Sequence, residues 1–204
     1  MLVPVLILTA AMNQPRAVSG AADLVLEPVI SEAEYCREAG GEIALHLRFI
    51  LHYQNATQTP IVLPMFDLLT RYELFSDDAA LKLNRPNADI SFHRDHALDA
   101  TKLDASTPDP KLFRILRPGE IASSYGSLSI VVQPVHADLP SLLGKDYYLR
   151  VHMNPWPAER KTGEKLRTLW QRFGVLRMAE IPSLPLNLHV EHRPRPDVCR
   201  LSID

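Results

Sequence analysis

The chain has 204 residues, and its 22 Lys and Arg side chains nearly balance 24 Asp and Glu, which gives a formal net charge of −2 at pH 7. This balance offers no electrostatic basis for binding nucleic acid or an anionic membrane, so neither is expected as a partner. No Gly-rich phosphate loop, Rossmann fingerprint or Walker pattern occurs in the sequence, and we expect no cofactor.

The N-terminal segment has the pattern of an export signal. Residues 2–12 form an uninterrupted apolar stretch, and a run of small residues follows at 17–22. Because about 20 apolar residues are needed to cross a bilayer, this stretch is too short for a transmembrane helix but matches a signal peptide. We expect residues 1–22 to be a signal peptide, residues 23–204 to form a single domain with no stable membrane span, and the protein to be secreted or periplasmic. The alternative is that residues 2–12 are a core strand or helix of a cytosolic protein.

Alternation of apolar and polar residues with a period of two dominates the rest of the chain. It is clearest from Ile43 to Tyr53, where the odd-numbered residues are all apolar or aromatic, as in a half-buried strand. The turn that follows carries the glycosylation sequon Asn55-Ala56-Thr57, which has meaning only in a eukaryotic source. Nine such strands, separated by turn residues, favour two packed antiparallel sheets. The other eight are Leu24–Ile30, Pro60–Leu63, Phe66–Phe75, Leu112–Leu116, Ser127–Val132, Tyr147–Met153, Val175–Ala179 and Leu186–His192.

One segment, residues 163–173, is predicted to be a helix. Thr162 can cap its start and Gly174 can end it. We expect this short helix to pack on the sandwich through one face and to present its basic side to water. The apolar face comprises Leu166, Leu169, Trp170 and Phe173, and the opposite face comprises Lys165, Arg167, Gln171 and Arg172.

The two cysteines, Cys36 and Cys199, stand near opposite ends of the expected domain. In an oxidising compartment we expect them to form a disulfide that ties down the C-terminal strand. If the protein is cytosolic instead, they are reduced, buried thiols.

Residues 84–110 are polar and show no sustained alternation, which predicts a long loop. Within it, His93, Asp95 and His96 place two imidazoles and a carboxylate close together, where they could ligate a divalent metal. The alternative is an exposed loop whose histidines form ordinary hydrogen bonds.

A second group of histidines follows from the strand alternation. His46, His52, His152 and His189 all fall on the polar side of their strands, opposite the apolar residues. If those strands are neighbours, the imidazoles converge on a metal site or a pH-sensitive patch; otherwise they coat the outside of the sandwich.

The candidate binding surface is the Asn154-Pro155-Trp156-Pro157 loop with the basic face of the helix. The prolines flanking Trp156 would hold its indole rigidly exposed, as an anchor for a protein or carbohydrate partner. Tyr147, Tyr148, Lys165 and Arg172 complete this candidate surface. The alternative is that Trp156 folds back over the end of the core.

Two segments carry a resemblance to a known group of proteins. Residues 112–120 read as a strand that enters Pro-Gly-Glu, and residues 144–153 read as a Gly-x-x-Tyr-x-Leu strand. This arrangement, over residues 43–154, resembles exported immunoglobulin-like domains of bacteria, including those related to a small intracellular proteinase inhibitor family. The resemblance implies a binding role and an immunoglobulin-like fold. With the helix predicted above, the expected fold is an all-β, antiparallel immunoglobulin-like β-sandwich with one short accessory helix at about 163–173. The 84–110 insertion and the helix depart from that pattern, and no binding residue is carried over.

The expected function is non-enzymatic binding or structural interaction, with no catalytic residue assigned. The serines at 123–127 lack the G-x-S-x-G pattern of a nucleophile elbow and precede a strand, whereas that elbow precedes a helix. The alternative is a metal-dependent or other hydrolase that uses the 84–110 loop and the outward histidines.

Overall fold

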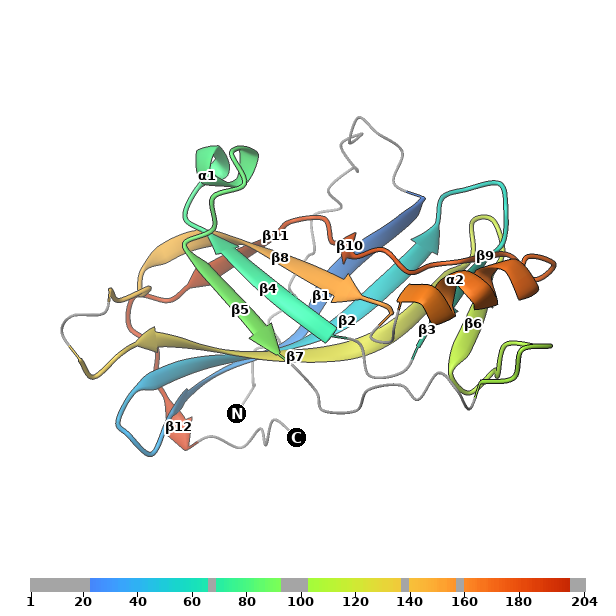
Figure 1. The fold of residues 1–204 in the computed structure, drawn as a ribbon. Helices are drawn as coiled ribbons and strands as arrows, with labels where there is room; N and C mark the ends of the chain where they lie inside the picture. The colour runs from blue at the N-terminus through green and yellow to red at the C-terminus, as the bar shows by residue number, and fades with distance from the viewer. Residues whose placement is uncertain (1–22, 66–68, 93–102, 137–139, 157–159, 199–204) are drawn as a thin grey trace, which may run out of the picture.

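The computed structural model describes residues 23–65, 69–92, 103–136, 140–156 and 160–198 (Figure 1). Within these residues β-strands predominate and the two helices are short. The elements in chain order are β1 (Leu24–Arg37), β2 (Ile43–Asn55), β3 (Ile61–Pro64), β4 (Leu69–Phe75), α1 (Asp78–Lys82), β5 (Ala88–Phe92), β6 (Phe113–Leu116), β7 (Ile121–Gln133), β8 (Lys145–Asn154), α2 (Arg160–Leu169), β9 (Val175–Leu176), β10 (Ile181–Pro182), β11 (Leu186–Val190) and β12 (Asp197–Val198).

The described strands form three sheets (Figure 1). The first sheet has the order β12-β1-β2-β7, the second has the order β10-β8-β4-β5 with β11 also paired to β8, and the third has the order β6-β3-β9. Neighbouring strands run antiparallel except β1 with β12 and β3 with β9. The predicted all-β, mainly antiparallel architecture with a short accessory helix is therefore confirmed.

The first two sheets share the main hydrophobic core. The odd-numbered side chains of β2, from Ile43 to Tyr53, point into it, because alternate residues of a strand face the same side. Phe49 of the first sheet stacks on Tyr72 of the second, with ring centroids 6.1 Å apart. Tyr72 also donates its hydroxyl to the carbonyl oxygen of Ser127 at 3.0 Å, which ties β4 to β7. The opposite wall of the core comes largely from β8, through Tyr147, Leu149, Val151 and Met153.

A second, smaller core lies between the third sheet and α2. The edge of the Trp170 indole meets the Phe113 ring, with centroids 4.9 Å apart. Leu166 and Trp170 turn the same side of the helix inward, as the helical spacing predicts. The buried residues of this cluster are Val62, Phe113, Trp156, Leu166, Trp170 and Leu176.

The structure corrects the predicted bounds of this helix. α2 begins at Arg160, so Thr162 lies inside the helix and does not cap it. Leu169 is exposed, which removes it from the apolar face. The helix also ends earlier than predicted, at Leu169, and a turn at residues 170–173 separates it from Gly174, so Gly174 does not end it. The φ of Gly174 is 142°, and a Cβ at this position would collide with the carbonyl oxygen of Pro60.

Each of the nine predicted strands overlaps an observed strand, although β1 and β7 extend well beyond their predicted bounds, and β5, β10 and β12 are additional. β5 lies inside residues 84–110, which the sequence predicts to be a long loop. That prediction is wrong for Ala88–Phe92, since these residues pair with Thr70–Leu74 of β4. β5 forms because it pairs with β4, and the local alternation of apolar and polar residues does not reveal this pairing.

Asn55 connects the first sheet to the third. Its side chain is fully buried, and its Nδ2 donates to the carbonyl oxygens of Thr59 and Leu116, both at 2.9 Å. Its Oδ1 accepts from the backbone N–H of Thr57 at 2.9 Å and from the Thr57 hydroxyl at 2.8 Å. These four bonds fill the hydrogen-bonding capacity of the carboxamide. In the folded protein, Nδ2 of Asn55, the atom to which a sequon oligosaccharide is attached, therefore already donates two hydrogen bonds within the protein.

Substituting Asn55 should destabilise the fold more than substituting its exposed neighbour. We expect N55A to lower the free energy of unfolding by about 3 kcal/mol, because the carbonyl oxygens of Thr59 and Leu116 lose the carboxamide as a donor. Q54A, the control, should change it by less than about 0.5 kcal/mol. Urea unfolding followed by circular dichroism measures both values, and equal values for the two variants would contradict this role of Asn55.

Candidate functional site

A pocket of about 480 Å³ lies beside β6, at the edge of the third sheet. Its walls come from β6, from the residue that follows β3, and from the segment before β6. Pro108 and Pro110 belong to this last segment and restrict its backbone. The lining residues are Met65, Pro108, Pro110, Phe113, Arg114 and Ile115.

Hydrogen bonds fix the segment that precedes β6 and forms one wall of the pocket. Some lie within this segment, and others come from residues just after α2. The Asp104 carboxylate accepts from the backbone N–H of Ser106 at 2.7 Å and from its hydroxyl at 2.8 Å, and these bonds lower the pKa of Asp104. Trp170 donates its indole N–H to the carbonyl oxygen of Asp104 at 3.2 Å. Arg172 donates to the carbonyl oxygen of Ser106 at 2.7 Å. The wall is therefore anchored to the second core.

The lining is apolar apart from one cation. Ile115 leaves 39% of its surface exposed, although it belongs to a strand. Arg114 is half exposed, and its Nη2 lies 3.7 Å from Oε1 of Glu120, a loose ion pair that leaves donors for a ligand. Ligand pockets typically combine a predominantly apolar lining with a few polar groups that orient the ligand. This pocket suits a small apolar group that carries a negative charge.

Trp156 does not form an exposed anchor. Only 6% of its surface is exposed, and the indole packs in the second core against α2. Tyr147 is also buried, on the core side of β8, and burial raises the pKa of its phenol. The expected exposure of Trp156 is therefore wrong, and the alternative, in which it folds back over the end of the core, is confirmed.

The remaining candidate residues of that surface lie apart from one another. Tyr148 is half-buried on the outward face of β8. Lys165 and Arg172 are exposed, but Arg172 is already engaged with the Ser106 carbonyl oxygen and lies 4.7 Å from the centroid of the Phe173 ring. Arg172 therefore supports the pocket wall, and a direct role in binding stays a prediction for Tyr148 and Lys165.

A buried charged network occupies the outward face of the second sheet. Only 3% of Glu73 is exposed, and its Oε2 lies 2.7 Å from Nε2 of His152. Nδ1 of His152 lies 2.5 Å from Oε1 of Glu180. Arg71 lies 3.3 Å from Glu73 and 3.2 Å from Glu180, and Arg150 lies 3.6 Å from Glu73. Two carboxylates thus face two guanidinium groups and one imidazole.

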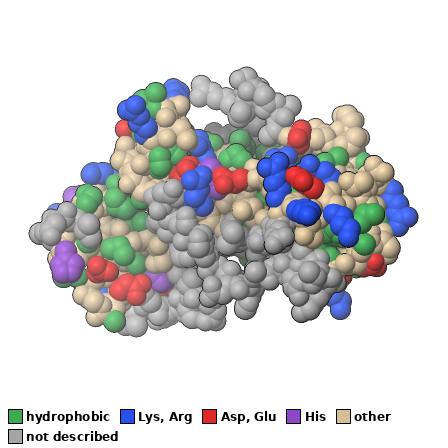
Figure 2. Space-filling view, in the orientation of Figure 1, with side chains coloured by type: hydrophobic (Ala, Val, Ile, Leu, Met, Phe, Trp, Pro, Cys, Tyr) green, Lys and Arg blue, Asp and Glu red, His purple; other side chains and the backbone are tan. Residues whose placement is uncertain are grey.

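The charged side chains of this network contact one another. Figure 2 shows acidic, basic and histidine side chains side by side over the part of the surface formed by β4 and β8. Both ring nitrogens of His152 face carboxylate oxygens, so neither is directed at a substrate. Arg150 also donates to Oδ1 of Asn84 at 2.7 Å, and its guanidinium lies over the Phe75 ring. The arrangement resembles structural compensation of buried charge more than a catalytic dyad.

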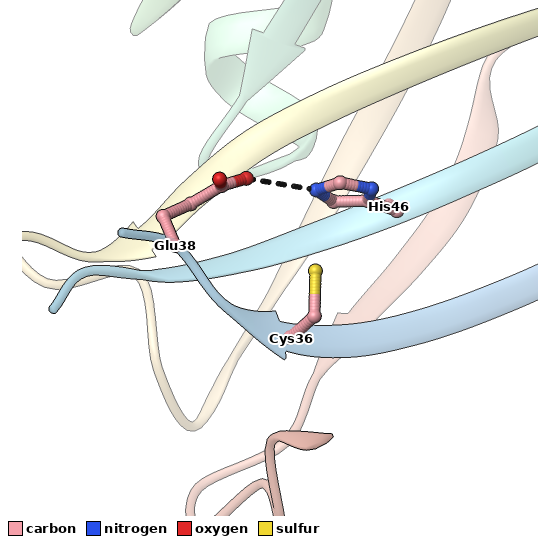
Figure 3. A group of neighbouring side chains, drawn as sticks. All are labelled: Cys36, Glu38 and His46. Atoms are coloured by element: carbon pink, nitrogen blue, oxygen red, sulfur yellow. Dashed lines mark hydrogen bonds and ion pairs between the residues drawn. The ribbon is translucent and has the colours of Figure 1, made fainter. Parts of the chain in front are cut away.

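A third group joins Cys36, Glu38 and His46 on the outward face of the first sheet (Figure 3). Nε2 of His46 lies 3.1 Å from Oε1 of Glu38, and one sulfur, nitrogen or oxygen atom from each residue lies within 4.8 Å of the others. Cys36 is fully buried. Nδ1 of His46 is buried and has no hydrogen-bond partner.

Two predictions of the sequence fall outside the described residues. His93, Asp95 and His96, the candidate metal ligands, belong to residues 93–102, and Cys199 belongs to residues 199–204. The residues described include no free cysteine, and β12 brings Asp197 and Val198 alongside Cys36 and Arg37. The Cys36–Cys199 disulfide stays a prediction.

The outward histidines lie on the predicted side of their strands but do not converge. His46 and His52 belong to the first sheet, whereas His152 and His189 belong to the second. His52 bonds to Ser123 at 2.8 Å and His189 to Asp146 at 2.6 Å, while the other two have the partners given above. The convergence required for a shared metal site is therefore wrong, because β2 and β8 are not neighbours.

The pocket and the charged network have only faint sequence signals. Pro108-Asp109-Pro110 marks a stiff segment before a strand, but nothing local shows that it closes over β6. Arg71 and Glu73 share the polar side of β4, which indicates an outward face but not its burial. Both features depend on tertiary packing.

Removing the charge of Glu73 should destabilise the protein strongly. We expect E73Q to lower the free energy of unfolding by about 3 kcal/mol, since it removes the buried carboxylate that Arg71, Arg150 and His152 share. E180Q is the matched control, because Glu180 is half exposed and its loss should cost less than about 1 kcal/mol. Denaturant unfolding at neutral pH measures both, and an E73Q value at or below that of E180Q would contradict the buried role of Glu73.

The comparisons with known proteins found no family model, no curated protein and no solved structure that matches this chain. Among the described residues, no helix has the length and apolar character needed to span a membrane.

Proposed function

We propose that this protein is a non-enzymatic binding domain, secreted or periplasmic, whose binding site is the pocket beside β6. The observation that carries the proposal is the pocket itself, about 480 Å³ in volume and apolar except for Arg114. This volume falls in the usual range for small-molecule sites, roughly 300–1,000 Å³. The resemblance to exported immunoglobulin-like domains of bacteria points to the same kind of role.

The ligand class follows from the lining. Met65 and Ile115 offer flexible apolar contacts, and Pro108 and Pro110 offer rigid ones. Arg114 is the cationic group of the lining, so a carboxylate, sulfonate or phosphate on an apolar or aromatic body is the best match. An acidic end of a protein partner and an acidic sugar share this chemistry with a small metabolite.

The alternative function, hydrolysis, draws less support from the geometry. His46, His52, His152 and His189 each have a partner within the protein, and they lie in two different sheets. A general base must lie within reach of the substrate proton, and none of these four histidines lines the pocket. Binding at the pocket needs no such group.

A charge placed in the pocket wall should weaken the binding of a probe with an apolar body. The probe is a naphthalene sulfonate dye, which combines an aromatic body with an anionic group. We expect I115E to weaken its affinity at least roughly tenfold, since the carboxylate must be buried beside the dye and repels the sulfonate. L83E is the matched control, because it removes an exposed apolar side chain, 64% exposed, outside the pocket.

Isothermal titration calorimetry measures these affinities, with the fluorescence of Trp170 as a second readout through its contact with Phe113. Equal loss of affinity in I115E and L83E would show that the dye binds exposed apolar surface in general, which would contradict the proposed site.

Arg114 should set the preference for an anionic ligand. We expect the native protein to bind the sulfonate about tenfold more tightly than naphthalene methanol, its neutral analogue, because a hydrogen bond to a charged group is worth about 1.5–3 kcal/mol. R114Q should remove that preference and leave the affinity for the neutral analogue within about twofold. R117Q, which replaces a cation just beyond the pocket, is the control. A preference that survives in R114Q would exclude this role.

A further inference from the structure

Positive charge is concentrated on α2 and just after it. Figure 2 shows Lys and Arg side chains gathered over the part of the surface where α2 lies in Figure 1. Residues 160–177 contain six of the 22 Lys and Arg of the chain and one of its 24 Asp and Glu, so this segment carries a formal charge of +5 and the remainder −7. The six cationic residues are Arg160, Lys161, Lys165, Arg167, Arg172 and Arg177.

The helical spacing of α2 separates a buried side from an exposed row. Gly163 and Leu166 are buried against the second core. Lys161, Lys165 and Leu169 are exposed and follow one another at intervals of four residues, so they form one row along the helix. We call these three residues the α2 row. Its last member, Leu169, leaves 43% of its surface exposed and adds an apolar contact beside the cations.

The two lysines of the α2 row have no counter-charge within the described part of the chain. Both are exposed, and neither has an ion-pair partner among those residues. The carboxylate of Glu164 already pairs with Arg160, at 2.9 Å. Lys161 and Lys165 are therefore available to carboxylates of a partner.

The size of the basic segment favours a short acidic partner. α2 has 10 residues and is about 15 Å long, since a helix rises about 1.5 Å per residue. A nucleic acid, a long acidic polysaccharide or an anionic membrane extends beyond this length and meets the remainder of the chain, whose formal charge is −7. A short protein segment avoids that repulsion, and it can also offer an apolar side chain to Leu169.

The spacing of the α2 row matches that of an extended chain. Neighbouring members of the row are about 6 Å apart along the helix axis, and alternate residues of an extended chain are about 6.6 Å apart. We propose that α2 is a docking surface for an extended acidic segment of a partner protein with the pattern Glu-x-Glu-x-Leu. Its two carboxylates pair with Lys161 and Lys165, and its leucine contacts Leu169. None of these three residues lines the pocket beside β6, so this surface is separate from it.

The test uses the acetylated and amidated peptide Glu-Ser-Glu-Ser-Leu, titrated into the isotopically labelled full chain and followed by NMR at low ionic strength. We expect saturable chemical-shift changes that are largest at the backbone amides of α2. K161E/K165E should weaken the affinity at least roughly tenfold, because two attractive ion pairs become two repulsive ones. Added salt should weaken the binding of the peptide to the native protein.

K82E/R85E is the matched control. It makes the same change in net charge, at exposed cations on and just after α1, which lies at the other end of the molecule from α2 (Figure 1). We expect it to change the affinity by less than about twofold. L169S should weaken binding of the leucine peptide about threefold and leave binding of Glu-Ser-Glu-Ser-Ser unchanged, since only the first peptide makes the apolar contact. Far-UV circular dichroism establishes that each variant is folded.

The absence of saturable shifts in the native protein would overturn the proposal, as would equal losses of affinity in K161E/K165E and K82E/R85E. Shifts confined to the pocket lining, with affinity lost in I115E, would assign the peptide to the pocket and reject the α2 row. Tighter binding of a DNA duplex or of anionic lipid vesicles than of the peptide, lost in K161E/K165E, would reject a protein segment as the partner.

Discussion

The placement of β2 between β1 and β7 constrains everything else in the first sheet. Its odd-numbered side chains are buried in the core shared with the second sheet, so its even-numbered ones must face outward. A slip of one residue would exchange the two sets, exposing Leu47, Phe49 and Leu51 and burying Arg48. The burial of the apolar set, at about 1.5–3 kcal/mol for each large side chain, makes that exchange prohibitive.

Buried polar side chains on the outward faces of the first and second sheets have different sets of partners. On the second sheet, Glu73 and His152 are buried and contact each other; Arg71 and Arg150 compensate the charge of Glu73, and Glu180 is the second partner of His152. On the first sheet, His46 is buried and its Nε2 pairs with Glu38, while its Nδ1 has no hydrogen-bond partner among the described residues. An incompletely satisfied buried group is unusual in folded proteins and often marks a functional position.

Strand alternation predicts the larger part of the fold because the pattern from Ile43 to Tyr53 and its counterparts report directly which face is buried. It misses β10 and β12, which are two residues long and exist through pairing with β8 and β1. The position of Trp156 is also beyond local sequence: rigid flanking prolines restrict the backbone but do not determine whether the indole turns outward or toward α2. The pocket beside β6 arises from segments separated by more than forty residues, from Met65 to Ile115. The chain topology brings these segments together, and the local sequence of each segment does not predict it.

The four hydrogen bonds of Asn55 bear on how the protein is produced. In a eukaryotic secretory pathway, an oligosaccharide is attached to an Asn-x-Thr sequence in surface-accessible chain, and its attachment point is the side-chain nitrogen. In this fold that nitrogen donates to Thr59 and Leu116 inside the junction of two sheets. A chain modified before it folds could not form that junction. Recombinant material from yeast or animal cells would therefore divide into an unmodified, native fraction and a glycosylated fraction that fails quality control, whereas a bacterial host avoids the division.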